Sequence, residues 1–108
     1  MFDPDDDFDP ELAELENLSN SVLDLTRAGR LDEAEHDCLE LRRRFPREMD
    51  WMERTADVAV AKGQNARAIE HYERCMDYID RNPDGFDPEV KEDFRSLIER
   101  LRSEPKDR

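Results

Sequence analysis

The chain has 108 residues, of which 30 are acidic and 17 are Lys or Arg, so its formal net charge is −13. This length predicts one domain with no room for a deep, walled substrate cavity, which disfavours a large enzyme. A negative field repels phosphate backbones and anionic lipid headgroups. We therefore expect neither nucleic acid nor a membrane surface as a partner.

The two ends of the chain are expected to lie outside the fold. Residues 1–9 combine acids with Phe and Pro, which predicts a flexible acidic tail, and residues 104–108 are expected to be a flexible C-terminus. No secretory signal precedes the helical pattern, and no apolar run approaches the ~20 residues of a membrane helix. Cys38 and Cys75 then fit reduced thiols in a core. These features predict a cytoplasmic protein with a helical domain over residues 10–103.

The first predicted helix starts at Asp9-Pro10-Glu11, because Asp is a good N-cap and Pro suits the first helical position. Ala28 and Gly29 end it. Its apolar stripe, at spacings of three and four residues, consists of Leu12, Leu15, Leu18, Val22 and Leu25. A second helix is expected from Leu31 to Phe45, closed by Pro46.

A third helix is expected from Glu48 to Lys62, and Gly63 stops it. The fourth begins near Asn65 and ends before the turn at residues 82–85. The fifth begins at residues 86–89, where Phe-Asp-Pro-Glu repeats the start of the first helix. No segment alternates apolar and polar residues as a strand does. The sequence thus predicts an all-α fold of about five helices.

The middle of the chain contains a repeat of 34 residues. Gly29 and Gly63 have this separation, as do Ala34 and Ala68 and also Cys38 and Tyr72. With Pro46 at the end of the first unit, the pattern resembles the tetratricopeptide repeat family. The resemblance covers residues 15–82, with residues 87–102 similar to a capping helix. It implies antiparallel helical hairpins stacked as a short solenoid.

The resemblance also implies protein binding in a concave groove lined by the first helix of each repeat. The candidate groove residues are Glu16, Ser19, Asn20, Leu23, Arg27, Glu53, Asp57 and Val60. Acids outnumber bases among them, so a basic or amphipathic segment of another protein is the expected partner. An alternative interpretation that is equally open is that these residues form a solvated helix face without a partner. Two repeats are few for a solenoid, and a homodimer would cover an exposed end.

Other motifs in the sequence indicate little chemistry. Residues 80–85 resemble the first half of a calcium loop, but Lys91 stands where its glutamate belongs. His71 and Cys75 share a helical face without a second ligand pair, and His36 and His71 are both expected at the surface. Arginines 42–44 sit where cations offset a helix dipole. We predict no catalysis, no metal and no cofactor.

Two alternatives to groove binding remain open. One is an acidic decoy that occupies a basic nucleic-acid-binding surface through residues 3–11, by charge rather than by shape. The other is a structural subunit whose interaction is with itself, through the stripe of the last helix or through Trp51.

Overall fold

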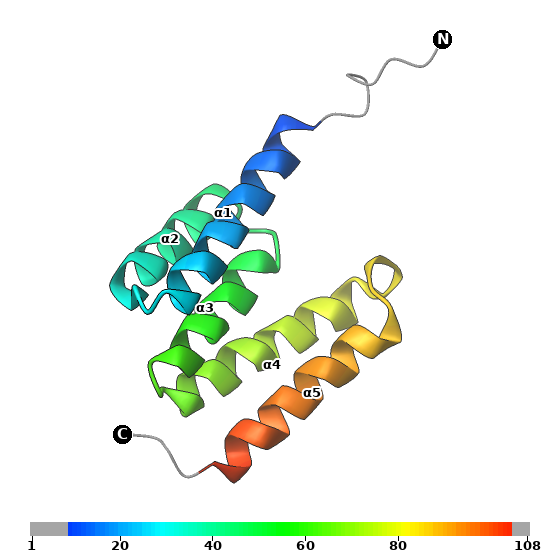
Figure 1. Ribbon diagram of the computed structural model, residues 1–108. Coiled ribbons are helices and arrows are strands. Elements are labelled where there is room, and N and C mark those ends of the chain that lie inside the picture. Colours follow the sequence, from blue (N-terminus) through cyan, green and yellow to red (C-terminus); the bar gives the residue numbers. More distant parts are fainter. Residues whose placement is uncertain (1–8, 105–108) are drawn as a thin grey trace.

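The computed structural model describes residues 9–104 (Figure 1). Its elements are α1 (Pro10–Arg27), α2 (Leu31–Arg44), α3 (Asp50–Ala61), α4 (Asn65–Arg81), the 3-10 turn η2 (Pro83–Gly85) and α5 (Pro88–Ser103). Within this range there is no strand, so the predicted all-α fold is confirmed. Except for Asp9 and Glu104, the tails expected at residues 1–9 and 104–108 lie outside the described residues.

The start of α1 agrees with the sequence. One carboxylate oxygen of Asp9 accepts hydrogen bonds from the backbone N–H groups of Glu11 (3.0 Å) and Leu12 (3.3 Å). Although the same Phe-Asp-Pro-Glu sequence spans the start of α5, the Asp87 side chain makes no capping hydrogen bond with the described residues. An identical local sequence therefore begins both helices, but only the first uses its Asp side chain as a cap.

The ends of α2 and α3 differ slightly from the expected ones. Phe45 caps α2 rather than belonging to it. Residues 46–49 form a turn, so α3 starts at Asp50 instead of Glu48 and ends at Ala61. A proline followed by charged residues leaves too little apolar surface to extend the helix backwards.

Two glycines reverse the chain between paired helices. Gly29 has φ +77° and Gly63 has φ +76°, a left-handed conformation that L side chains rarely adopt. Five residues after each glycine stands an alanine, Ala34 or Ala68, and both are fully buried. A small side chain there lets neighbouring helices approach closely. The two hairpins thus bury equivalent positions 34 residues apart.

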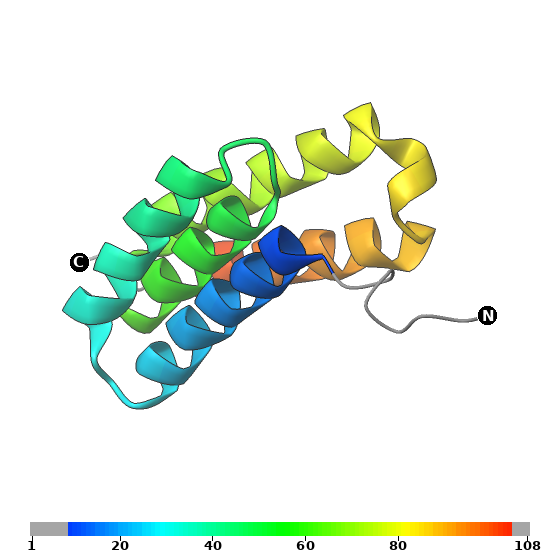
Figure 2. The same cartoon turned by 90° about the horizontal axis from the view of Figure 1, so that it is seen from above.

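The helices are arranged around α3. Helices α1 and α3 run in one direction, whereas α2 and α4 run in the opposite one (Figure 1). Helix α3 packs against α1, α2 and α4, and α5 packs against α4 (Figures 1 and 2). Close backbone contact does not join α2 to α4 within the described residues. The central helix is consequently the floor between these two.

Buried apolar side chains join α3 to both of its neighbouring hairpins. Toward α1 and α2 the core consists of Leu15, Val22, Ala34, Cys38, Leu41, Trp51 and Val58. Toward α4 and α5 it consists of Ala56, Ala59, Ala68, Tyr72, Cys75, Ile79, Phe94, Ile98 and Leu101. Both cysteines are free and buried, which confirms the expectation of core thiols.

The apolar stripe of α1 is buried or half-buried, as predicted, except at its first residue. Leu12 was expected in the core but is 50% exposed, whereas Leu15, Ser19 and Val22 are buried. Leu12 lies near the start of the helix, where it lines an open surface pocket with Phe45 and Glu48 instead of packing into the core. Ser19, four residues after Leu15 and three before Val22, lies on the buried line between them, and Leu18 is half-buried beside it.

Candidate functional site

The residues predicted to line a groove occupy one line on α1 and one on α3. Their spacing of three and four residues places members of each set above one another along the helix. Glu16, Asn20 and Arg27 are exposed, and Val60 is 39% exposed. Leu23 is half-buried. We call these residues, together with Glu53 and Asp57, the α1–α3 face.

Ser19 departs from the expectation of an accessible groove residue. It is only 7% exposed and belongs to the buried stripe of α1. Its small side chain allows α1 to pack closely on its neighbours, so its part is structural. The α1–α3 face therefore excludes Ser19.

A half-buried charge cluster lies on α3. The guanidinium of Arg54 contacts Glu53, with Nη2 2.8 Å from Oε2, and Asp57, with Nη1 3.4 Å from Oδ2. The Arg54 side chain is only 12% exposed. Its buried Nε has no hydrogen-bond partner among the described residues. We call Glu53, Arg54 and Asp57, with Tyr72, the α3 charge cluster.

Tyr72 extends this cluster to α4. Its hydroxyl donates a hydrogen bond of 2.6 Å to Oδ1 of Asp57. The ring of Tyr72 also packs at 5.7 Å, centroid to centroid, against Phe94 of α5. A core tyrosine thus fixes the position of one of the two acids.

Burial dominates the electrostatics of the charge cluster. It raises the pKa of Glu53, and the neighbouring Arg54 only partly opposes this effect. Burial likewise raises the pKa of Asp57, against the opposing effects of the Tyr72 hydroxyl and Arg54. Two carboxylates share one guanidinium, so the ionised cluster carries an excess negative charge in partly dehydrated surroundings. Such an arrangement is suited to binding a cation.

Sequence reasoning found Glu53 and Asp57 but missed Arg54 and Tyr72. The sequence places Tyr72 only as the counterpart of Cys38 in the repeat. That position says nothing about the partner of its hydroxyl. Arg54 had a usable signal, since it stands beside one acid and three residues before another on the same helix. Its burial depends on the packing of neighbouring helices.

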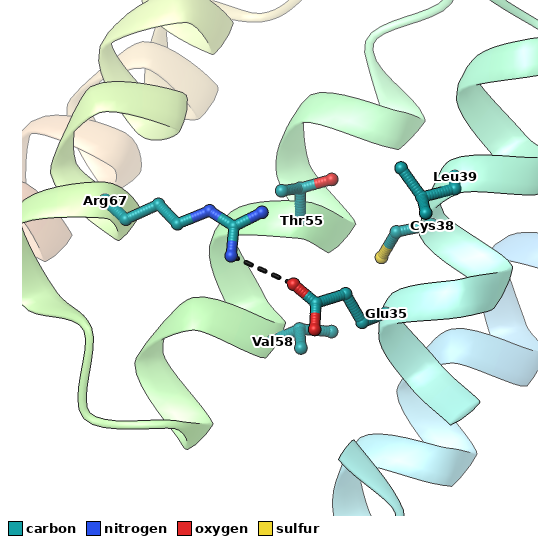
Figure 3. A pocket seen from close by; sticks show the side chains of 6 residues that line it. All are labelled: Glu35, Cys38, Leu39, Thr55, Val58 and Arg67. Atoms are coloured by element: carbon teal, nitrogen blue, oxygen red, sulfur yellow. Dashed lines mark hydrogen bonds and ion pairs between the residues drawn. The ribbon is translucent and has the colours of Figure 1, made fainter. Parts of the chain in front are cut away.

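A second surface, which sequence reasoning did not identify, runs between α2 and α4 with α3 as its floor. Figure 3 shows one end of it, where Glu35 of α2 points toward Arg67 of α4 across Thr55 and Val58. A cavity of about 20 Å³ lies there. We call this surface the outer groove, and its residues are Glu35, Leu39, Arg42, Trp51, Thr55, Val58, Lys62, Arg67, His71 and Arg74.

Glu35 ties the two walls of the outer groove together. Its carboxylate lies 2.6 Å from Lys62 Nζ and 3.0 Å from Arg67 Nη1. The hydrogen bonds from these two cations, Lys62 first, hold the pKa of Glu35 below its ordinary value. Leu39, beside it, is 63% exposed.

Trp51 lies at the other end of the outer groove. Its indole nitrogen donates to the backbone oxygen of Pro46 at 3.1 Å, which fixes the ring. The guanidinium of Arg42 lies 4.7 Å from the ring centroid, and His71 meets the ring edge-on at 6.3 Å. His71 is therefore half-buried rather than at the surface, which corrects the expectation, whereas His36 is exposed.

In the calcium-like turn and the basic run, side chains of the chain itself already pair with charged residues that the sequence singled out. Lys91 Nζ lies 2.6 Å from Oδ1 of Asp80, so an ammonium group already neutralises the first acid of the calcium-like turn. In the basic run, Arg43 pairs with Glu40 and Arg44 pairs with Glu14. Burial raises the pKa of Cys38 to about 11 and that of Cys75 to about 12. Both thiols therefore stay protonated and unreactive at neutral pH.

The described residues contain no group of three or more His, Cys, Asp or Glu side chains placed to hold a metal ion. Among these residues, no helix has both the length and the apolar composition that crossing a lipid bilayer requires. No family model, curated protein or solved structure matches the chain.

Proposed function

We propose that the protein is a helical-repeat interaction module that binds a basic or amphipathic segment of another protein on the α1–α3 face. The observation that carries this proposal is the α3 charge cluster. Glu53 and Asp57 are half-buried, yet they share only one guanidinium. A partner's Lys or Arg would offset the desolvation cost of the second carboxylate, and this gain would be specific to the site.

The surroundings of the cluster support a protein ligand rather than a free cation. Leu23 on α1 and Val60 on α3 remain partly exposed and supply apolar area beside the acids. An amphipathic segment presents both a cation and apolar side chains to such a surface. The 34-residue repeat, with its buried alanines and left-handed glycines, fits a tetratricopeptide-like module in which parallel first helices form the binding face.

The test compares single charge removals at equal net charge. A synthetic peptide that alternates Lys and Leu is titrated into the full chain, into Glu53→Gln and Asp57→Asn, and into Glu99→Gln on α5. Glu99 is exposed and belongs to none of the ion pairs between described residues. We expect Glu53→Gln and Asp57→Asn to weaken binding by about tenfold, the effect of about 1.4 kcal/mol. Glu99→Gln should leave the affinity nearly unchanged.

Two results would contradict the proposal. Equal losses in all three variants would show that the peptide responds to the overall negative charge. A larger loss after replacing Asp5, Asp6 and Asp7 with Asn would instead support the acidic decoy, whose binding should also collapse as salt rises. Circular dichroism of each variant checks that the helices are retained.

A further inference from the structure

The outer groove is formed by three lines of side chains from three helices. Helix α2 contributes positions 35, 39 and 42, and α4 contributes positions 67, 71 and 74. The floor consists of positions 51, 55 and 58 of α3, with Lys62 at its end. Each set follows the spacing of a single helix face.

Basic side chains are concentrated in this groove. It holds the four cations Arg42, Lys62, Arg67 and Arg74, and the nearby acids are Asp32, Glu35 and Glu70. The whole chain, by contrast, has 17 Lys and Arg against 30 acids. Lys62, Arg67 and Arg74 are paired with these acids, whereas Arg42 is in none of the ion pairs between described residues, so the outer groove has a formal excess of one positive charge within an acidic chain.

The environment of His71 reports the same concentration of positive charge. Burial lowers the pKa of His71, and Arg74, Arg67 and Arg42 lower it further, while Glu70 opposes them. Three arginines from α2 and α4 are thus close enough to influence one imidazole. Arg42 is the most available of them, since it is exposed and belongs to none of the ion pairs between described residues.

The exposed apolar part of the groove is at its edge on α2. Leu39 is 63% exposed and stands on α2 between Glu35 and Arg42. The cavity beneath it, about 20 Å³, has room for about one water molecule and is too small for a bound metabolite. A ligand for this surface therefore lies across the groove instead of entering it.

We propose that the outer groove is a second docking surface, which binds an acidic amphipathic segment of a partner protein. Carboxylates of the segment pair with Arg42 and Arg74 on the two walls, and an apolar side chain of the segment covers Leu39. Charge complementarity selects this occupant, because Arg42 has no carboxylate partner among the described residues and the groove has an excess of positive charge within an otherwise acidic chain. This proposal does not rest on binding at the α1–α3 face and stands whether or not that face binds a partner.

The chain's only tryptophan provides a local readout, because Trp51 lies in the outer groove. The probe is a synthetic peptide that alternates Glu and Leu, with a twin carrying Gln in place of Glu. We expect the acidic peptide to change Trp51 emission, with an affinity that falls as salt rises, and the Gln twin to bind at least tenfold more weakly. Calorimetry on the full chain gives the affinities.

Two exposed arginines of the groove and one outside it complete the test. Arg42→Gln and Arg74→Gln should each weaken binding of the acidic peptide about three- to tenfold, corresponding to about 0.7–1.4 kcal/mol. The control is Arg100→Gln, an exposed position on α5 that has the same change in net charge. It should leave the affinity within about twofold of the unmodified chain.

Several outcomes would overturn this proposal. They are equal binding of the Gln twin, equal losses in all three variants, and peptide binding by calorimetry without a change in Trp51 emission. A second copy of the chain is the competing occupant. Light scattering that shows self-association, lost in both Arg42→Gln and Arg74→Gln, would assign the groove to that contact instead.

Discussion

At the scale of single residues, Glu53 and Asp57 show that burial can raise the pKa of a carboxyl group even when a guanidinium lies beside it. Each lies near the Arg54 guanidinium, and Asp57 also accepts the Tyr72 hydroxyl. Even so, the pKa of both carboxyl groups is raised, with burial as the largest cause. One guanidinium within a half-buried site does not compensate the dehydration of two carboxylates.

This imbalance predicts a pH dependence of stability. Because the folded-state pKa of both acids lies above the unfolded value of about 4, their contribution to the free energy of unfolding is largest below that value. It is lost as pH rises through the raised pKa. The double variant Glu53→Gln and Asp57→Asn should therefore gain stability relative to the unmodified chain as pH rises from about 4 to 7. Urea unfolding at several pH values measures the difference.

Glu35 provides a control in which the effect of pH on stability has the opposite sign. Lys62 and Arg67 lower its pKa, so its stabilising contribution is present above the unfolded value and disappears as pH falls through the lowered one. Glu35→Gln should consequently lose stability relative to the unmodified chain as pH rises. A common pH slope for both sets of variants would contradict the assignment of burial and pairing as the respective causes.

At the scale of elements, the turns between paired helices depend on backbone conformation alone. A Cβ added at Gly29 or Gly63 would meet no atom within 4 Å, yet both residues have positive φ. Gly29→Ala and Gly63→Ala should each lower the free energy of unfolding by about 1–2 kcal/mol, the cost of a left-handed L residue. Gly85→Ala is the matched control, because its surroundings are equally open and its φ is not positive. Urea unfolding would contradict this account if all three variants lost equal stability.

The helices were predictable because their signals are local. Glycines, prolines and the three- and four-residue apolar spacing indicated five helices, and the predicted starts of α1, α2 and α4 agree with the structure. The displaced start of α3 and the unused Asp87 cap depend on how a turn leaves the preceding helix. Leu12 shows the same limit, since an apolar position on a stripe is buried only where another helix reaches it.

The candidate surfaces were predictable only in part. Glu53 and Asp57 follow from spacing along one helix, but the burial of Arg54 requires the neighbouring helices. The outer groove takes Arg42, Trp51 and His71 from three helices, and no spacing in the sequence brings them together. Residue types alone could not distinguish these cations from the solvated helix faces of a highly charged chain.

At the scale of the whole molecule, stability should be uneven. Among the described residues, α3 makes close backbone contact with three helices, whereas α5 makes such contact with α4 only among the α-helices. We expect native-state hydrogen exchange to give lower opening free energies for the amides of α5 than for those of α3. Leu101→Ala, which removes a buried side chain of α5, should lower protection in α5 more than in α1 and α2. Uniform protection through all five helices would contradict this expectation and show a single cooperative unit.

The central position of α3 has a consequence for any pair of ligands. Glu53 and Asp57 project from the same short helix that supplies Trp51 and Thr55, so the two surfaces share a single rigid rod. If occupancy on one side rotates or shifts this rod, the opposite side changes affinity by the same factor, in both directions, as thermodynamic reciprocity requires. Replacing α3 with an unrelated helix would therefore change ligand affinity at the α1–α3 face and at the outer groove together.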